Sequence, residues 1–241
     1  MLKICHLYPD LMNLYGDRGN VICLCRRAQW RGIRPEVTWV SLGTNLDFAQ
    51  FDLIFMGGGQ DREQLSVCQD FQRVKGSSLR EAVEAGVVCL AICGGYQLMG
   101  HSYSTHDGKT LPGIGVMDVV TQAGKKRLIG NVVVESDLTG GTLVGFENHS
   151  GKTYLGPSVK PLGRVVQGYG NNGEDGCEGA LYRGLVGTYL HGSLLPKNPR
   201  LADYLIESAL RRRDPAFCLE PLDDTIEMVA HQAAVKRAKA R

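Results

Sequence analysis

Three features that this chain lacks narrow its functional class before any motif is considered. No apolar run approaches the ~18 residues needed to cross a bilayer, and the apolar start turns polar too early for a signal peptide, so we expect a cytoplasmic protein. No cysteine pair has the C-x-x-C spacing of zinc or redox motifs, so the eight cysteines predict free thiols and no metal site. The net charge of +2 is too small to indicate nucleic-acid binding.

The composition indicates a globular protein, with 43% apolar residues in a chain of 241. We predict one main domain over residues 1–213 and a C-terminal helical extension over 214–241. Within this extension, residues 223–241 run from acidic to basic, which suits a helix dipole. One apolar stripe consists of Ile226, Val229, Ala230 and Ala233, and this helix is either a docking element or a solvated terminal helix.

Short apolar strands alternate with helical patterns through the first hundred residues. The predicted strands are Lys3–Leu7, Glu36–Ser41, Asp52–Met56 and Val87–Ile92, and the predicted helices are Gly19–Trp30 and Ser78–Ala85. This alternation favours βαβ units and a parallel sheet, whose ligands bind at the carboxyl ends of the strands. A glycine-rich loop, Gly57–Asp61, follows the third of these strands.

The pattern changes between about residues 111 and 190. Valine-rich segments separated by glycine turns, Asn131–Glu135, Arg164–Gln167 and Val186–Leu190, predict antiparallel or mixed strands built onto the edge of the sheet. A helix is predicted over Arg200–Arg213, with Pro199 as its start signal.

A cysteine stands where the apolar strand Val87–Ile92 meets a glycine-rich helix start. The run Cys93-Gly94-Gly95-Tyr96-Gln97 is typical of a nucleophile elbow, in which a sharp turn pushes the nucleophile out of the sheet. Free backbone N–H groups at such a helix start stabilise a thiolate and the oxyanion formed when it attacks a carbonyl. The alternative is a cysteine that serves as a small buried hydrophobe, the role we assign to Cys89.

A cysteine nucleophile requires a base, and two of the six histidines are serious candidates. His191 ends the apolar run Leu185–Leu190 and precedes a glycine, so it is predicted at the sheet edge where Cys93 lies. His149 lies in a predicted polar turn, residues 145–151, whose role could equally be structural. His191 is the preferred base.

Taken together, these motifs resemble the class I glutamine amidotransferases. Gly-Phe-Glu-Asn-His-Ser-Gly (145–151) and Gly-Thr-Tyr-Leu-His-Gly (187–192) are similar to the cobyric-acid-synthase-type branch, and residues 7–20 resemble the GatD family, the glutaminase subunits of lipid II isoglutaminyl synthase. The resemblance covers nearly the whole chain. It implies a three-layer, flavodoxin-like α/β fold with a mostly parallel central sheet and an added antiparallel or mixed region.

The resemblance also implies roles for individual residues. Cys93 would attack the side-chain amide of L-glutamine, releasing ammonia and leaving a γ-glutamyl thioester that water hydrolyses. His191 would be the acid and base. The oxyanion donors would be the N–H groups of Gly94 and of a glycine in the 57–59 loop, with Gly58 preferred.

Two further residues would contact the substrate. Gln97 would lie beside the glutamine, and Arg127 would bind its α-carboxylate, for which a guanidinium is well shaped. From composition alone, a plain surface cation is the preferred interpretation of Arg127. The chain departs from the His-x-Glu pattern of many triad enzymes, because Ser193 stands where the glutamate would be. The group that orients His191 is therefore left open, with Glu147 and a backbone carbonyl as candidates.

A glutaminase of this kind needs a second activity to use its ammonia. The chain contains no Gly-x-x-x-x-Gly-Lys-Ser/Thr loop, so no ATP site is predicted here, and ATP and Mg²⁺ are expected on a partner. The resemblance implies a MurT-like subunit of the Mur ligase family that amidates the D-glutamate of lipid II, with the complex acting at the inner face of the membrane. Rival hypotheses are a glutaminase for another acceptor such as a corrinoid, a stand-alone γ-glutamyl hydrolase or cysteine peptidase, and a non-catalytic binding subunit.

Overall fold

A parallel sheet forms the centre of the protein in the computed structural model, which describes residues 1–59 and 61–240. Its strand order is β11-β12-β4-β3-β1-β2, and every neighbouring pair except β11–β12 is parallel. The strands are β1 (Leu2–Leu7), β2 (Pro35–Val40), β3 (Leu53–Met56), β4 (Val88–Ile92), β11 (Ala180–Tyr182) and β12 (Leu185–Thr188).

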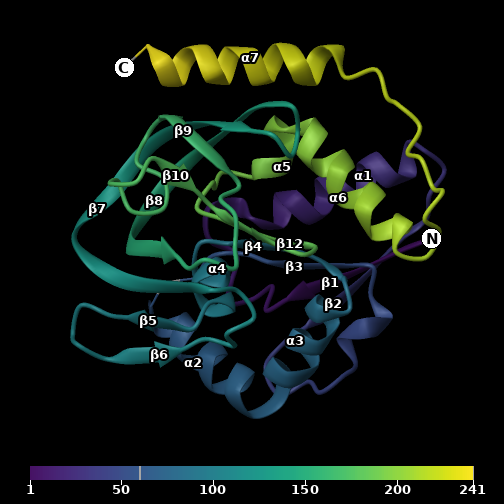
Figure 1. Ribbon diagram of the computed structural model, residues 1–241. Helices are drawn as coiled ribbons and strands as arrows, with labels where there is room; N and C mark the ends of the chain where they lie inside the picture. The colour runs from purple at the N-terminus through teal and green to yellow at the C-terminus, as the bar shows by residue number, and fades with distance from the viewer. Residues whose placement is uncertain (60, 241) are drawn as a thin grey trace.

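Helices cover both faces of this sheet (Figure 1). Figure 1 shows α1 (Arg18–Gln29), α5 (Leu194–Lys197) and α6 (Pro199–Arg211) on one face, and α2 (Asp61–Asp70) and α3 (Gly76–Glu84) on the other. Short helical segments lie at Leu14–Gly16, Phe48–Gln50 and Phe71–Lys75, and α4 (Gly94–Met99) follows β4. Because both faces are covered, β3 and β4 are apolar and buried at every position.

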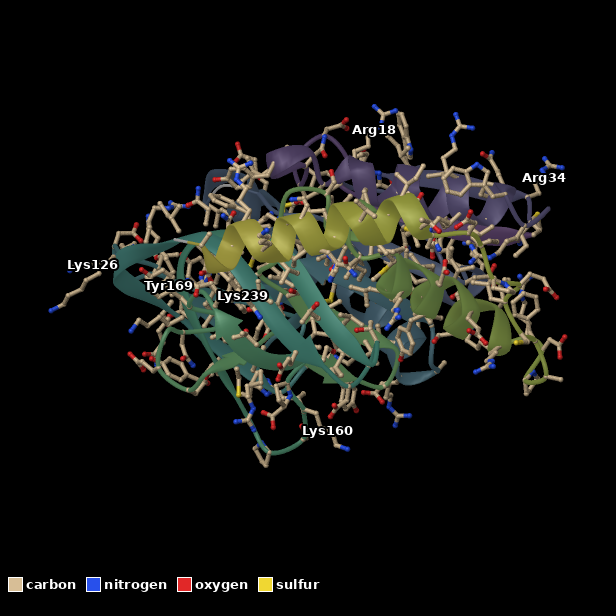
Figure 2. All side chains as sticks on the ribbon, turned by 90° about the horizontal axis from the view of Figure 1, so that it is seen from above. Arg18, Arg34, Lys126, Lys160, Tyr169 and Lys239 are labelled. Carbon is tan, nitrogen blue, oxygen red and sulfur yellow. The ribbon has the colours of Figure 1, made fainter. Side chains whose placement is uncertain are left out.

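A second, mixed sheet lies beside the first. It contains β5 (Ser102–Ser104), β6 (Thr110–Pro112), β7 (Val119–Ser136), β8 (Gly141–Leu155), β9 (Gly163–Gln167) and β10 (Cys177–Glu178). The long antiparallel ribbon of β7 and β8 shifts register between Ala123 and Leu128. Figure 2 shows Lys126, which lies within this shift, projecting away from the body of the protein.

The predicted α/β class with a mostly parallel sheet is confirmed, and the elements predicted in the first hundred residues agree with the observed ones to within a few residues. The predicted strand Asn131–Glu135 is only the last part of the longer β7. Two further details differ. The added strands form a sheet of their own, and the predicted strand Val186–Leu190 belongs to the central sheet, where β12 pairs in parallel with β4. The reason is burial, since all four residues of β12 are buried. Gln60 and Arg241, in the predicted loop and terminal helix, lie outside the described residues.

The last helix, α7 (Thr225–Lys239), lies across the β7–β8 ribbon (Figures 1 and 2). Asp224, which precedes it, pairs with the buried Arg27 of α1 at 2.7 Å. His231 fixes its middle, because its ring nitrogens lie 2.8 Å from Thr142 Oγ1 and 2.8 Å from the carbonyl oxygen of Lys197. Ala238 packs with Val133 and Val144.

The apolar stripe predicted on this helix lies on its outer face. Ile226 is 81% exposed and Val229 64% exposed, and Ala230 and Ala233 are exposed as well. The helix therefore contacts the protein through other residues, and its stripe is open to solvent. None of the helices in residues 1–59 and 61–240 has both the length and the apolar composition of a membrane span.

His231→Ala is expected to loosen α7 without unfolding the sheets, because it removes two hydrogen bonds, each worth about 1 kcal/mol. Hydrogen exchange followed by mass spectrometry should show faster exchange over residues 225–239 and unchanged protection in β3 and β4. Gln232→Ala, at the exposed neighbouring position, is the control. Equal exchange of α7 in both variants would contradict the anchoring role of His231.

Candidate active site

The thiol of Cys93 stands at a strained turn between β4 and α4. Cys93 has φ 51° and ψ −106°, a conformation that a non-glycine residue adopts only when its surroundings impose it. Its N–H donates to the carbonyl of Thr188 in β12 over 2.8 Å. The next turn requires glycine, because a Cβ on Gly95 would lie 2.9 Å from the carbonyl oxygens of Met56 and Gly57. The predicted strand, turn and helix are thus all present.

His191 reaches the same place from the end of β12. It is fully buried and exchanges two backbone hydrogen bonds with Phe146 of β8, at 2.7 and 3.3 Å. Gly58 lies between the two predicted catalytic side chains. A Cβ on it would be 2.8 Å from His191 Cε1 and 3.3 Å from Cys93 Cβ. The fold therefore brings Cys93 and His191 together across a glycine that leaves room for both.

The group that faces the imidazole on its other side is Asp17, which the sequence analysis did not identify. Its Oδ1 lies 3.5 Å from His191 Nδ1, and its Oδ2 accepts the N–H of Gly58 over 2.8 Å. Asp17 is fully buried at the start of α1. The sequence did contain one indication of this role. Asp17 is acidic, precedes the predicted helix Gly19–Trp30 and lies within residues 7–20, which resemble the GatD family.

Glu147, one of the two candidates for this role, lies elsewhere. Its carboxylate accepts the N–H groups of Tyr169 and Gly170 over 2.8 and 2.9 Å, and Oε2 is 3.7 Å from His149 Nε2. It therefore holds a turn and faces the other histidine.

His149, the second candidate base, lies in β8 and not in the predicted polar turn, because residues 145–149 pair with β7, and it belongs to the wall of the site. Its ring stacks on Tyr189 with centroids 3.6 Å apart, and its Nδ1 is 2.6 Å from the carbonyl oxygen of Gly151. One ring nitrogen is thereby committed to the backbone, and the ring is fixed in position. The geometry favours His191 as the partner of Cys93.

The charges around His191 favour its protonated form. Burial lowers the pKa of the imidazole, but the neighbouring Cys93 thiolate and the Asp17 carboxylate outweigh burial and raise the pKa to about 10. His191 is therefore expected to carry its proton at neutral pH.

A cavity of about 440 Å³ opens over the thiol. Its wall contains Leu14, Tyr15, Gly59, Gln64, Cys93, Gln97, Tyr103, Arg127, Asn148, His149, Ser150 and Gly151. The predicted substrate residues Gln97 and Arg127 both lie in this wall. Gln97 is buried and donates through Nε2 to the hydroxyl of Tyr189 over 3.0 Å, while its Oε1 has no partner among the described residues.

The structure differs from the sequence prediction at Gly58. Its N–H donates to Asp17, so it is not free to receive an oxyanion, and Gly58 is absent from the cavity wall. Gly59, its neighbour, does line the cavity. The N–H groups of Gly59 and Gly94 have no hydrogen-bond partner in the described part of the chain. Nowhere in that part do three or more His, Cys, Asp or Glu side chains gather to hold a metal ion.

The profile of CobB/CobQ-like glutamine amidotransferase domains matches residues 3–199. The chain belongs to this family. Within the CobB/CobQ-like family, it is 45% identical over 237 residues to subunit GatD of the glutamine-hydrolysing lipid II isoglutaminyl synthase of Staphylococcus aureus (strain N315), covering 98% of this chain and 96% of that protein. The GatD subunit of Streptococcus pneumoniae (strain ATCC BAA-255 / R6) is 41% identical and covers 88% of this chain and 82% of its own length.

More distant comparisons agree with the fold. A cobyric acid synthase of Pelotomaculum thermopropionicum is 37% identical over 57% of this chain, but the match spans only 28% of that protein. A crystal structure of a glutamine amidotransferase superposes with a TM-score of 0.58 at 15% identity, covering 85% of this chain and 98% of that one. The predicted resemblance to the CobB/CobQ-like amidotransferases and to the GatD subunits is confirmed.

Asp17→Asn is expected to lower the pKa of His191 from about 10, because the variant lacks the carboxylate charge that favours the imidazolium. A pH titration of the His191 ring followed by NMR measures this pKa directly. The pKa of His191 in the folded protein lies above the ordinary 6.5. Its interactions in the protonated form therefore contribute fully to the free energy of unfolding below pH 6.5, and this contribution is lost as the pH rises through about 10. The gap in unfolding free energy between wild type and variant should shrink across this window.

Asp118→Asn is the matched control, because Asp118 pairs with His101 at 3.1 Å on the surface. It should leave the His191 titration unchanged. A His191 pKa that is the same in wild type and Asp17→Asn would show that Asp17 does not hold the imidazolium.

Proposed function

We propose that this chain is the glutaminase subunit of a lipid II isoglutaminyl synthase. It hydrolyses L-glutamine to L-glutamate and ammonia and supplies the ammonia to a partner. The observation that carries the proposal is the arrangement of Cys93, His191 and Asp17, in which Cys93 lines the cavity and the buried His191 and Asp17 lie behind it. The near full-length similarity to GatD subunits supports the choice of complex.

In this mechanism the Cys93 thiolate adds to the carboxamide carbon of glutamine and forms a tetrahedral oxyanion. The His191 imidazolium gives its proton to the nitrogen, the C–N bond breaks, and ammonia leaves behind a γ-glutamyl thioester. Neutral His191 then takes a proton from water as the water oxygen attacks the thioester. Collapse of the second tetrahedral intermediate releases glutamate and restores the thiolate and imidazolium.

Asp17 supports both halves of this cycle. Facing Nδ1, it stabilises the imidazolium and leaves Nε2 as the nitrogen that exchanges protons with substrate. Its second oxygen holds the N–H of Gly58 and so fixes the glycine loop against the catalytic pair. The proposed reactive unit is a Cys93/His191 dyad whose histidine is oriented by Asp17.

The oxyanion would be received by the backbone N–H groups of Gly94 and Gly59. Gly94 directly follows the nucleophile, and Gly59 lies in the cavity wall. Both N–H groups are unpaired within the described residues, whereas that of Gly58 is not. Stabilising charge that develops only in the transition state is among the largest contributions to such reactions.

Glutamine would lie along the cavity wall. Arg127 offers a guanidinium to its α-carboxylate, and no carboxylate among the described residues pairs with Arg127. Gln97 offers an unpaired side-chain oxygen to an N–H of the substrate.

The acceptor chemistry would take place on a second subunit. The relatives are named as subunits, which supports a partner. We infer a MurT-like subunit of the Mur ligase family that binds ATP and Mg²⁺ and activates the D-glutamate α-carboxyl of the lipid II stem peptide, which ammonia converts to D-isoglutamine. Because lipid II is membrane-anchored, the complex would act in the cytoplasm at the inner face of the membrane, with no insertion of this chain.

Ammonia release from L-glutamine tests this proposal, measured for the chain alone and co-purified with a MurT-like subunit. Wild type should release ammonia in at least one condition. Cys93→Ala should abolish release, and His191→Asn should lower kcat by at least about 10³-fold, because both proton transfers depend on it. Cys89→Ala, at a buried cysteine of β4, is the control and should retain activity.

The outcomes separate the rival hypotheses. Release of amines from γ-glutamyl peptides, without activity on glutamine, would favour a stand-alone hydrolase. Transfer of ammonia to a corrinoid carboxylate but not to lipid II would show that the acceptor is a corrinoid. Absence of any release from wild type in both conditions would overturn the glutaminase proposal.

A further inference from the structure

We propose that Asn148 is a positioning residue that aims Arg127 at the substrate carboxylate and links it to Tyr15, the residue that covers His191. This inference rests on the proposed glutaminase function and identifies a specificity element within that site. Tyr15, Arg127 and Asn148 lie on three separate segments and all line the same cavity.

Asn148 binds Arg127 through two oxygens. Its Oδ1 accepts from Arg127 Nε over 2.9 Å, and its carbonyl oxygen accepts from Nη2 over 3.3 Å. Arg127 lies in the stretch of β7 where the pairing with β8 shifts register. The regular ladder does not fix its side chain there, so Asn148 supplies the constraint.

These two bonds decide which edge of the guanidinium remains available. A guanidinium has five N–H groups, and Nε with Nη2 forms one of its forked edges. Because Asn148 occupies that edge, the edge formed by Nη1 and Nη2 is left for another ligand. That edge presents two parallel N–H groups, which fit a carboxylate.

The same asparagine connects this cation to the catalytic histidine. Asn148 Nδ2 donates to the hydroxyl of Tyr15 over 2.6 Å. The Tyr15 ring meets the His191 ring edge to face, with centroids 4.9 Å apart and planes at 68°. Tyr15 is nevertheless 45% exposed and has φ 56°, a costly conformation for an aromatic residue. The hydrogen bond from Asn148 is the contact that holds its hydroxyl end.

The side-chain amide is the group that this arrangement requires. At position 148, an oxygen faces Arg127 while an N–H faces Tyr15, and an amide offers this acceptor and this donor on separate atoms of one short side chain. An aspartate would keep the oxygen but add a negative charge beside Arg127, where it would compete with the substrate carboxylate. Alanine would release both neighbours.

The affinity of the Cys93→Ala protein for L-glutamine, measured by calorimetry, tests this role without requiring turnover. Adding Asn148→Ala should weaken binding about 10-fold, and Asn148→Asp should weaken it further, because a competing charge is added. Binding of 4-aminobutanamide, which is glutamine without its α-carboxylate, should change less than about 2-fold in both variants. This compound lacks the group that Arg127 is proposed to bind.

Tyr15→Phe removes the hydroxyl and keeps the ring, and it should weaken glutamine binding about 3-fold. Combined with Asn148→Ala, it should add little, because one hydrogen bond joins the two residues. Tyr182→Phe is the matched control. Tyr182 bonds Glu84 over 2.9 Å on the surface, outside the cavity wall, so its loss should leave binding unchanged.

Each outcome bears on a separate conclusion. Failure of Cys93→Ala to bind glutamine at all, together with wild type that releases no ammonia, would overturn the proposed function and this inference with it. If Cys93→Ala binds glutamine and neither Asn148→Ala nor Asn148→Asp changes the affinity, the role of Asn148 would be overturned and the proposed function would stand. Equal weakening of glutamine and 4-aminobutanamide would also overturn it, because it would reveal a general structural role for Asn148.

Discussion

The site depends on one buried carboxylate. Asp17 faces His191 with one oxygen and the N–H of Gly58 with the other, so a single charge fixes both the imidazole and the glycine loop beside the thiol. A buried carboxylate without such partners would be strongly destabilising. Here it is compensated by a backbone donor and by an imidazolium whose own pKa it raises. Asp17 and His191 therefore stabilise each other's charge, and Asp17 also fixes the position of the glycine loop at Gly58.

The fold brings these groups together at one edge of the central sheet. Cys93 follows β4 and His191 follows β12, which are neighbouring parallel strands, and Asp17 lies between β1 and α1. Carboxyl ends of parallel strands meet at the same edge, so catalytic groups from distant segments converge there. The second sheet contributes Arg127 and Asn148 to the cavity wall, because both belong to the β7–β8 ribbon. In the proposed mechanism, chemistry and substrate recognition are thus contributed by two different sheets.

Predictions from sequence succeeded where the signal was local. The apolar runs of β3 and β4 and the glycines after Cys93 specify their conformations within a few residues, since a fully buried parallel strand and a sharp turn each tolerate few residue types. The predictions were less accurate where the neighbouring strand decides to which sheet a segment belongs. The segment Val186–Leu190 shows the same valine-rich pattern as the second sheet, yet β12 pairs with β4.

The α/β alternation, the elbow at Cys93 and the position of His191 at a strand end could be inferred from the sequence, because each depends on neighbouring residues. The contact of Asp17 with His191, the hydrogen bond of the Gly58 N–H and the outward direction of the apolar stripe of α7 depend on the folded chain. An acidic residue before a helix and a glycine after a strand have many possible partners in an extended chain. Long-range packing selects one, and that selection is not encoded in local spacing.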